Sequence, residues 1–194
     1  LFAMFSFLKK SRVSPKPLPD LPADAPASES PRMRKVLNVG GNSKEIQIPE
    51  AFGGWQHVML DIDPAVRPDV VCDARNLATL KGSEYDAVYC SHNLEHYFHH
   101  DVSRVLAGFL HVLKDDGFAY IRVPDMAELM RAVVRDGRDI EDVLYQSPAG
   151  PIAVIDVIYG LRTEIASSGN DFCAHQAGPT RKSRATPLKL AGYQ

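Results

Sequence analysis

The segment YDAVYCSHNLEHYFHHDVSRVLAGFLHVLKDDGFAYIRVPD (residues 85–125) decides the fold. It opens with one apolar run, 87–90, and closes with another, 118–123. Between them, apolar residues recur at the spacing of a helix that packs one side against a core: Val102, Val105, Leu106, Phe109, Leu110 and Leu113. Asp101 is placed to cap this helix, and Gly117 lies just past its end. A strand, a helix and a second strand in this order predict a right-handed βαβ unit.

Three more apolar runs precede this unit, at 36–39, 57–62 and 69–72. Their apolar residues are consecutive rather than alternating, which is typical of strands that are covered on both faces. We therefore predict an α/β fold with a Rossmann-like, doubly wound and mostly parallel sheet.

Helical patterns fill the rest of the chain after Pro124. Pro151 is suited to the first position of one of these helices, because its missing N–H has no partner to lose there. The predicted helices cover 126–134, 140–145, 152–165 and, more weakly, 182–191.

The N-terminal part has a different composition. Six of the fourteen prolines precede residue 32, and the stretch 11–31 contains no aromatic residue. Because proline removes amide donors and fixes extended backbone, we predict a Pro-rich disordered tail over 1–33 and a domain over 34–194. The apolar stretch 1–8 is too short for a membrane span and precedes its lysines, the reverse of a secretory signal, so we expect no export and no membrane insertion.

The charge and the cysteine content of the chain limit the kinds of partner and the cellular compartment that we expect. Lys and Arg number 22 against 24 Asp and Glu, a net charge of −2, which gives no global attraction to nucleic acid or an acidic membrane. The three cysteines cannot all pair and form no CxxC motif, which favours a reducing, cytoplasmic location. The expected partner is a small molecule.

Ligands of such sheets bind at the carboxyl ends of the strands, so the residues there are the candidates. The first end, LNVGGNS (37–43), has paired glycines but neither the GxGxxG nor the P-loop spacing, which argues against a pyrophosphate cradle. Asp61, about twenty residues after the glycines, can accept both hydroxyls of a ribose or cap the turn before Pro64. Asp73 can accept from an adenine amine or form an Asx-turn.

The fourth strand end carries the sequence HNLEH (92–96), which matches the HxxEH motif of inverted zinc proteases. That motif needs both histidines on one helical face and a third ligand further along, for which Glu128, Glu141 and Glu164 are the downstream glutamates. A strand end followed by a loop is expected here instead. A zinc hydrolase is kept as an alternative, and no metal is assigned.

Taken in order, these motifs resemble the class I S-adenosylmethionine-dependent methyltransferases, in particular bacterial predicted methyltransferases of type 11 whose first motif begins with LN. The resemblance covers about 35–125, and SHNLEH followed by VLKDDG and VPD is its most specific part. It implies S-adenosylmethionine as cofactor and methyl transfer to a small-molecule acceptor. A non-catalytic nucleotide-binding module remains a further alternative.

The resemblance also implies roles for single residues. The glycine pair would lie under the methionine part of the cofactor, Asp61 would bind the ribose, and Asp73 with the Ala74 backbone would meet the adenine. Asn38 stands where the family usually has a carboxylate. The implied cofactor-binding residues are Asn38, Gly40, Gly41, Asp61, Asp73, Ala74 and Ser91, and the candidate catalytic bases are His92 and His96.

In this fold the segments after the fifth strand select the acceptor, here the substrate-side residues 125–178. Within them His175 is interpreted as a surface histidine in preference to a second base. Trp55, Tyr89 and Tyr97 are assigned to core packing in preference to a contact with the cofactor. The family's sheet has seven strands, and we expect this one to lack the last two. The edge would then be uncovered, either because the chain is a truncated product or because another subunit covers it by self-association.

Overall fold

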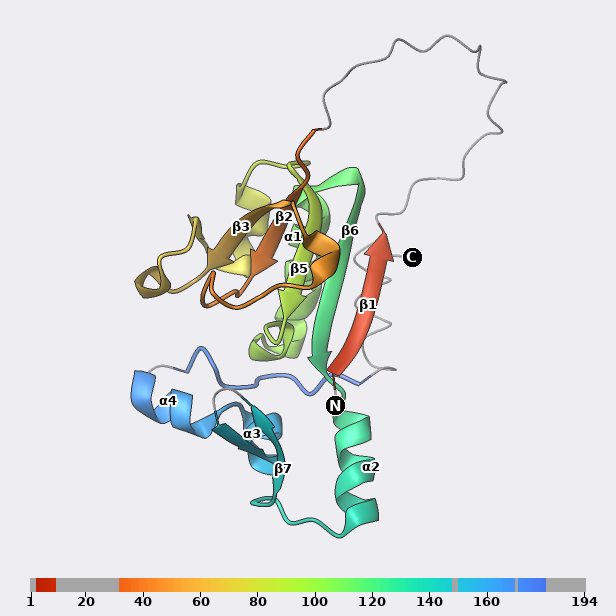
Figure 1. Cartoon of the computed structure of the whole chain (residues 1–194), viewed down its shortest axis with the longest axis vertical. Helices are drawn as coiled ribbons and strands as arrows, with labels where there is room; N and C mark the ends of the chain where they lie inside the picture. Colours follow the sequence, from red (N-terminus) through yellow and green to blue (C-terminus); the bar gives the residue numbers. More distant parts are fainter. Residues whose placement is uncertain (1–2, 10–31, 148–149, 170, 181–194) are drawn as a thin grey trace, which may run out of the picture.

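The computed structural model describes residues 3–9, 32–147, 150–169 and 171–180. In these residues six strands form the main sheet in the order β1-β6-β5-β2-β3-β4. Five of them run parallel, and β1 lies antiparallel at one edge (Figure 1). This is the predicted Rossmann-like α/β fold. The strands are β1 (Ala3–Lys9), β2 (Lys35–Val39), β3 (Gln56–Asp61), β4 (Val70–Val71), β5 (Tyr85–Ser91) and β6 (Leu113–Pro124).

One face of the sheet is covered by α1 (His99–Val112) and the short 3₁₀ helix η3 (Ala74–Thr79). The apolar stripe of α1 packs there, and Val105, Phe109 and Val112 are fully buried. Burial of this stripe removes the apolar residues of both layers from water, which is the main stabilising contribution to such a domain. The predicted helix and its buried face are confirmed.

Aromatic rings cover the opposite face. The Phe52 ring lies 5.8 Å from that of Tyr89 and 5.4 Å from that of Trp55, measured between ring centroids. Tyr120 and Phe118 of β6 complete the cluster. The core roles predicted for Trp55 and Tyr89 are therefore confirmed.

The ends of α1 differ from the prediction. The helix begins at His99 with Phe98 as its N-cap, so Asp101 lies in the first turn rather than at the cap. It ends at Val112, and β6 begins at once because Leu113 already pairs with Tyr85 of β5. Gly117 is therefore a residue of β6 and does not end the helix.

The edge of the sheet beside β6 is covered, contrary to the prediction. The backbone of β1 pairs with β6 from Ala3 opposite Pro124 to Lys9 opposite Phe118. An edge strand presents unpaired N–H and C=O groups, and a strand laid along it satisfies them. The predicted tail is thus wrong for residues 3–9, while 10–31 lie outside the described residues. Self-association stays a prediction, but the β6 edge through which it was expected is occupied by β1.

The described residues between 125 and 169 form a cap that lies beyond the carboxyl ends of the parallel strands (Figure 1). It begins with α2 (Met126–Asp136), which the Asp125 side chain caps and which Gly137 ends in a left-handed conformation. The other elements of the cap are β7 (Val143–Ser147), β8 (Gly150–Ala153), α3 (Val154–Tyr159) and α4 (Arg162–Ser168).

Only the first helix predicted for the cap is confirmed. The residues expected as a helix at 140–145 lead into the β7–β8 hairpin, because a short apolar run fits a strand as well as a helix. The helix expected at 152–165 is broken at Gly160, which has a φ of 98° and contacts the Cys173 backbone. The helix predicted at 182–191 lies outside the described residues.

Candidate active site

A cavity of about 540 Å³ opens between the carboxyl ends of the sheet strands and the cap. The cap contributes apolar side chains together with Tyr145, Asp156 and Glu164, and further polar groups come from the loops that follow β2 and β5 and from the segment after α4. The lining residues are Asn42, His92, His96, Arg122, Pro124, Tyr145, Ser147, Ile152, Asp156, Val157, Leu161, Glu164, Cys173 and His175.

The glycine turn after β2 is closely packed. Gly40 has a φ of 70°, a conformation that favours glycine, and a Cβ there would clash with the Asn93 side chain. A Cβ on Gly41 would lie 2.6 Å from the side-chain nitrogen of Asn38. Asn38 is buried beneath the turn, and its side-chain nitrogen lies 3.2 Å from His57 Nε2. A side chain at either glycine would therefore force a neighbouring asparagine side chain to move.

Asp61 ends β3 beside this turn. Its carboxylate accepts hydrogen bonds from the backbone N–H of Asn42 (3.1 Å) and from that of Asp63 (3.0 Å). Each oxygen thus receives one of these hydrogen bonds, while an ionised carboxylate has about four acceptor positions. Asp61 consequently joins the ends of β2 and β3 and keeps acceptor capacity for a ligand.

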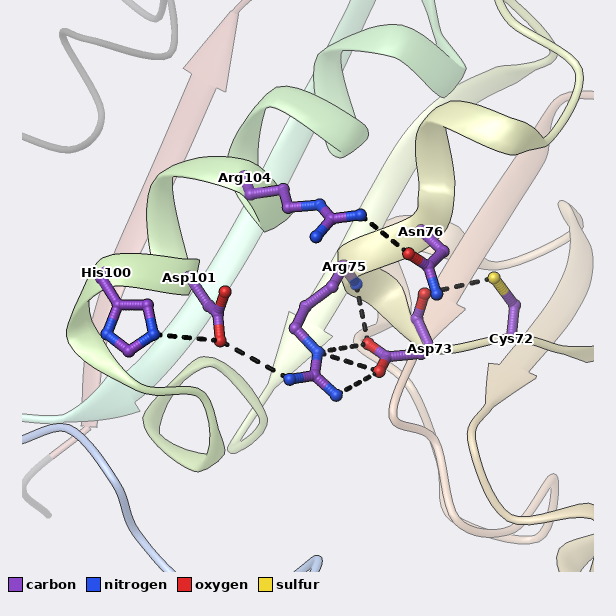
Figure 2. Close-up of polar contacts among 7 residues, drawn as sticks. All are labelled: Cys72, Asp73, Arg75, Asn76, His100, Asp101 and Arg104. Carbon is purple, nitrogen blue, oxygen red and sulfur yellow. Dashed lines mark hydrogen bonds and ion pairs between the residues drawn. The ribbon is translucent and has the colours of Figure 1, made fainter.

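Asp73 is engaged by a neighbouring guanidinium group, as Figure 2 shows. It caps η3 by accepting from the Arg75 backbone N–H, and its carboxylate lies 2.6 Å from the Arg75 side chain. Burial alone would raise the pKa of Asp73, but the hydrogen bonds from Arg75 outweigh it and hold the pKa below its usual value. Arg75 also reaches Asp101 of α1 at 3.5 Å. The local Asx arrangement weighed for Asp73 is thus present, with Ala74 buried beside it.

The segment from Ser91 to His96 leaves β5 as a strand end followed by a 3₁₀ turn, η4 (Leu94–His96), and not as a longer helix. His92 has a φ of 51°, its N–H donates to the Arg122 carbonyl, and its side chain is half exposed at the cavity. This does not favour the zinc hydrolase, whose motif needs both histidines on one face of a helix.

His96 lies beside the cavity with both ring nitrogens near backbone carbonyls. Its Nδ1 is 3.2 Å from the Ala174 oxygen, and its Nε2 is 3.0 Å from the His92 oxygen. A neutral imidazole carries one N–H, so it can donate to only one of these oxygens. His92 is therefore the better placed of the two candidate bases.

His175 does not lie freely on the surface, contrary to its interpretation from the sequence. Its ring packs edge-on against His96, with 5.0 Å between the ring centroids, and burial lowers its pKa. The fully buried Glu95 lies beside both rings. The sequence predicts neither the burial of Glu95 nor the contact of His175 with His96. His175 lies in a polar loop nearly eighty residues after η4, and no local pattern specifies that the two segments meet.

Six of the nine candidate residues thus form two groups, while Asp73 and Ala74 lie at the start of η3 and Ser91 ends β5. Gly40, Gly41 and Asp61 meet at the ends of β2 and β3, and Asn38 supports them from below. His92 and His96 line the cavity instead. Between these groups, Asn42 both binds Asp61 and lines the cavity.

Part of the sequence and the fold of the chain resemble known proteins. Residues 37–121 match a family described as a methyltransferase domain. A solved SAM-dependent methyltransferase of Archaeoglobus fulgidus is similar with a TM-score of 0.51 and 17% identity, over 84% of this chain and 62% of its own. A proposed methyltransferase of Bacillus halodurans gives a TM-score of 0.49 and 15% identity, over 82% of this chain and 62% of its own.

These findings show the class of fold. Residues 37–121 match a methyltransferase-domain family, and the chain has the Rossmann-like α/β fold of the solved Archaeoglobus fulgidus methyltransferase. The chain spans less than two thirds of the length of either solved structure. No curated protein matches its sequence. Among the described residues, none of the helices combines the length and apolar character needed to cross a bilayer.

Proposed function

We propose that this protein transfers a methyl group from S-adenosylmethionine to a small-molecule acceptor. The cofactor would bind at the carboxyl ends of β2, β3 and β5, and the acceptor would enter the cavity beneath the cap. The observation that carries the proposal is the Asp61 carboxylate, held beside the glycine turn with acceptor capacity left over. A ribose diol needs such a bidentate acceptor.

The residues present fit the cofactor. Gly40 and Gly41 bring the backbone turn close to the place where the methionine part would lie. Ser91 at the end of β5 would line the cofactor. Asp73 already binds Arg75 through both oxygens, so the adenine would rely on the Ala74 backbone unless Arg75 moves.

The chemistry requires little of the protein. The methyl group of a sulfonium is already activated, so the protein must align the acceptor with the methyl group and exclude water. A cavity of about 540 Å³ lined by apolar side chains and polar groups suits a small organic acceptor. The acceptor atom is not specified by these residues.

Where the acceptor carries a proton, His92 would take it. Its side chain faces the cavity, and its Nδ1 lies 3.4 Å from Glu95 Oε1, which would orient the ring. We therefore expect His92→Ala to lower methyl transfer more than it lowers cofactor binding. Radiolabelled S-adenosylmethionine with fractionated small-molecule extracts provides the assay.

Titration calorimetry tests the proposal. The chain should bind S-adenosylmethionine and its demethylated product at one site, and Asp61→Ala should weaken binding more than tenfold, about 1.4 kcal/mol. Asp63→Ala is the matched control: it removes the same charge two residues away, from a carboxylate that caps a 3₁₀ turn. No binding to either compound would overturn the proposal, and binding without methyl transfer would favour the non-catalytic module.

A further inference from the structure

A carboxylate is buried without hydrogen bonds at the side of the cavity. Glu95 is fully buried, and neither of its oxygens accepts a hydrogen bond from any described residue. The half-exposed His92 is nearest as an ion-pair partner, with 3.4 Å between Nδ1 and Oε1. A buried carboxyl group without hydrogen bonds is unfavourable unless a proton or a cation compensates it. The arrangement therefore leaves a place for a proton or a metal ion beside Glu95.

Two further imidazoles lie beside this carboxylate. One oxygen of Glu95, one nitrogen of His96 and one nitrogen of His175 all lie within 4.8 Å of one another. Ligand atoms that share a tetrahedral zinc ion are about 3.4 Å apart, so small side-chain rotations would close this set around an ion.

The hydrogen bonds of the two rings leave lone pairs for a metal. His175 Nδ1 lies 3.0 Å from the Val157 carbonyl oxygen and donates to it, so Nε2 carries the lone pair. His96 can donate through one nitrogen only, so a small rotation of the ring would turn the other nitrogen away from the carbonyl oxygen that it now faces and present it as a ligand. Histidines that bind metals commonly donate their second N–H to a backbone carbonyl or a carboxylate in this way.

Backbone contacts hold the distant parts of this set together. The N–H groups of Gln176 and Ala177 both donate to the Glu95 carbonyl, at 2.8 and 3.0 Å, and the His175 N–H donates to Tyr159. None of these hydrogen bonds uses the side chains of the cluster. The three side chains are therefore positioned before any ligand arrives.

We propose that Glu95, His96 and His175 bind a divalent first-row transition-metal ion such as Zn²⁺. Imidazole and carboxylate donors suit this class, whereas Mg²⁺ and Ca²⁺ favour oxygen ligands throughout. The set differs from that of the zinc hydrolase, which would use His92. Three protein ligands leave a coordination position for an oxygen of the acceptor in the cavity. The contact between the ion and the acceptor rests on the proposed function. Binding of the metal itself is independent of that function.

The test uses the full, untagged chain without S-adenosylmethionine. Equilibrium dialysis against Zn²⁺ followed by metal analysis should give one ion per chain. His175→Ala and Glu95→Gln should each lower the affinity at least tenfold. His100→Ala is the matched control, because it removes an exposed histidine at the start of α1 and should leave the affinity unchanged.

Cobalt substitution of the wild-type chain tests the proposal even if circular dichroism shows that a variant does not fold. Co²⁺ bound by the wild-type chain should give the visible absorption of a four- or five-coordinate site with nitrogen ligands. Absence of this spectrum, or equal zinc binding by all the variants, would overturn the proposal. Calorimetry with S-adenosylmethionine does not depend on the metal. A failure of the metal proposal therefore leaves the proposed function standing.

Discussion

The sheet and the cap are stabilised in different ways. In the sheet, a large cluster of buried apolar residues joins α1 to β2, β5 and β6, with Phe109 fully buried at its centre. In the cap, a smaller cluster that includes Leu129 is supplemented by polar contacts. Chief among these is the buried Asp156, which accepts from the Ala153 N–H and from Arg162.

This difference has a functional consequence. The residues proposed to bind the cofactor lie on the sheet, where packing fixes them. Most of the residues that would contact the acceptor lie on the cap or on the segment 171–178, which backbone hydrogen bonds attach to η4. Local opening requires less free energy where few apolar contacts are lost, so the cap should open before the sheet.

The largest expected effect comes from truncating the two cores. Phe109→Ala should lower the free energy of unfolding by about 3–5 kcal/mol and Leu129→Ala by about 2–5 kcal/mol. Urea denaturation measures both, and amide exchange separates them. Leu129→Ala should speed exchange in the cap while the sheet stays protected. Equal acceleration in both regions would show that cap and sheet open as one unit.

A smaller effect is expected at the glycine turn. Gly40→Ala places a Cβ in the left-handed region, at about 1–2 kcal/mol, and also displaces the Asn93 side chain. Gly54 has a φ of 76° with no atom near its would-be Cβ, so Gly54→Ala reports the backbone cost alone. Thermal denaturation should show a greater loss of stability for Gly40→Ala than for Gly54→Ala. Gly40→Ala should also weaken cofactor binding. Equal losses would contradict the close packing against Asn93.

The polar support of the cap should depend on pH. Burial alone would raise the pKa of Asp156, but the hydrogen bonds from Arg162 and the Ala153 N–H lower it. A lowered folded-state pKa gives stability that is present above the unfolded value, about 3.9, and is lost as the pH falls through the folded-state value. Arg162→Ala should therefore destabilise the protein at pH 7, and its difference from wild type should shrink below about pH 4.

The matched control for this variant lies on α2. Arg131 pairs with Glu128 one turn away in an exposed contact, so Arg131→Ala should change stability by no more than about 0.5 kcal/mol. Urea denaturation between pH 3 and pH 7 compares the two variants. A loss for Arg162→Ala that does not vary with pH would contradict the role assigned to Asp156.

The sheet was predictable because its signals are local. Each apolar run from 36–39 to 118–123 became a strand, and the stripe of α1 became a buried helix face. The cap was less predictable, since 140–145 fits a helix or a strand equally well until the partner strand β8 is known. The pairing of β1 with β6 depends on contact across more than a hundred residues, which no local pattern specifies.

The candidate site divides in the same way. Asp61 and the glycine turn follow from their place at strand ends, and the structure joins them through Asn42. The burial of Glu95 beside His175 follows from tertiary contacts made by the segment after α4. Motif reasoning could therefore find the proposed cofactor residues but not the cluster beside the cavity.

The central claim is that the cofactor binds on the sheet side of the site and the acceptor on the cap side. Amide hydrogen exchange with and without S-adenosylmethionine tests it most directly. We predict added protection in 39–43 and 61–63, where the Asp61 carboxylate holds the turn, and a smaller change at 91–93. Protection confined to 125–178, or no change anywhere on adding the cofactor, would contradict the account.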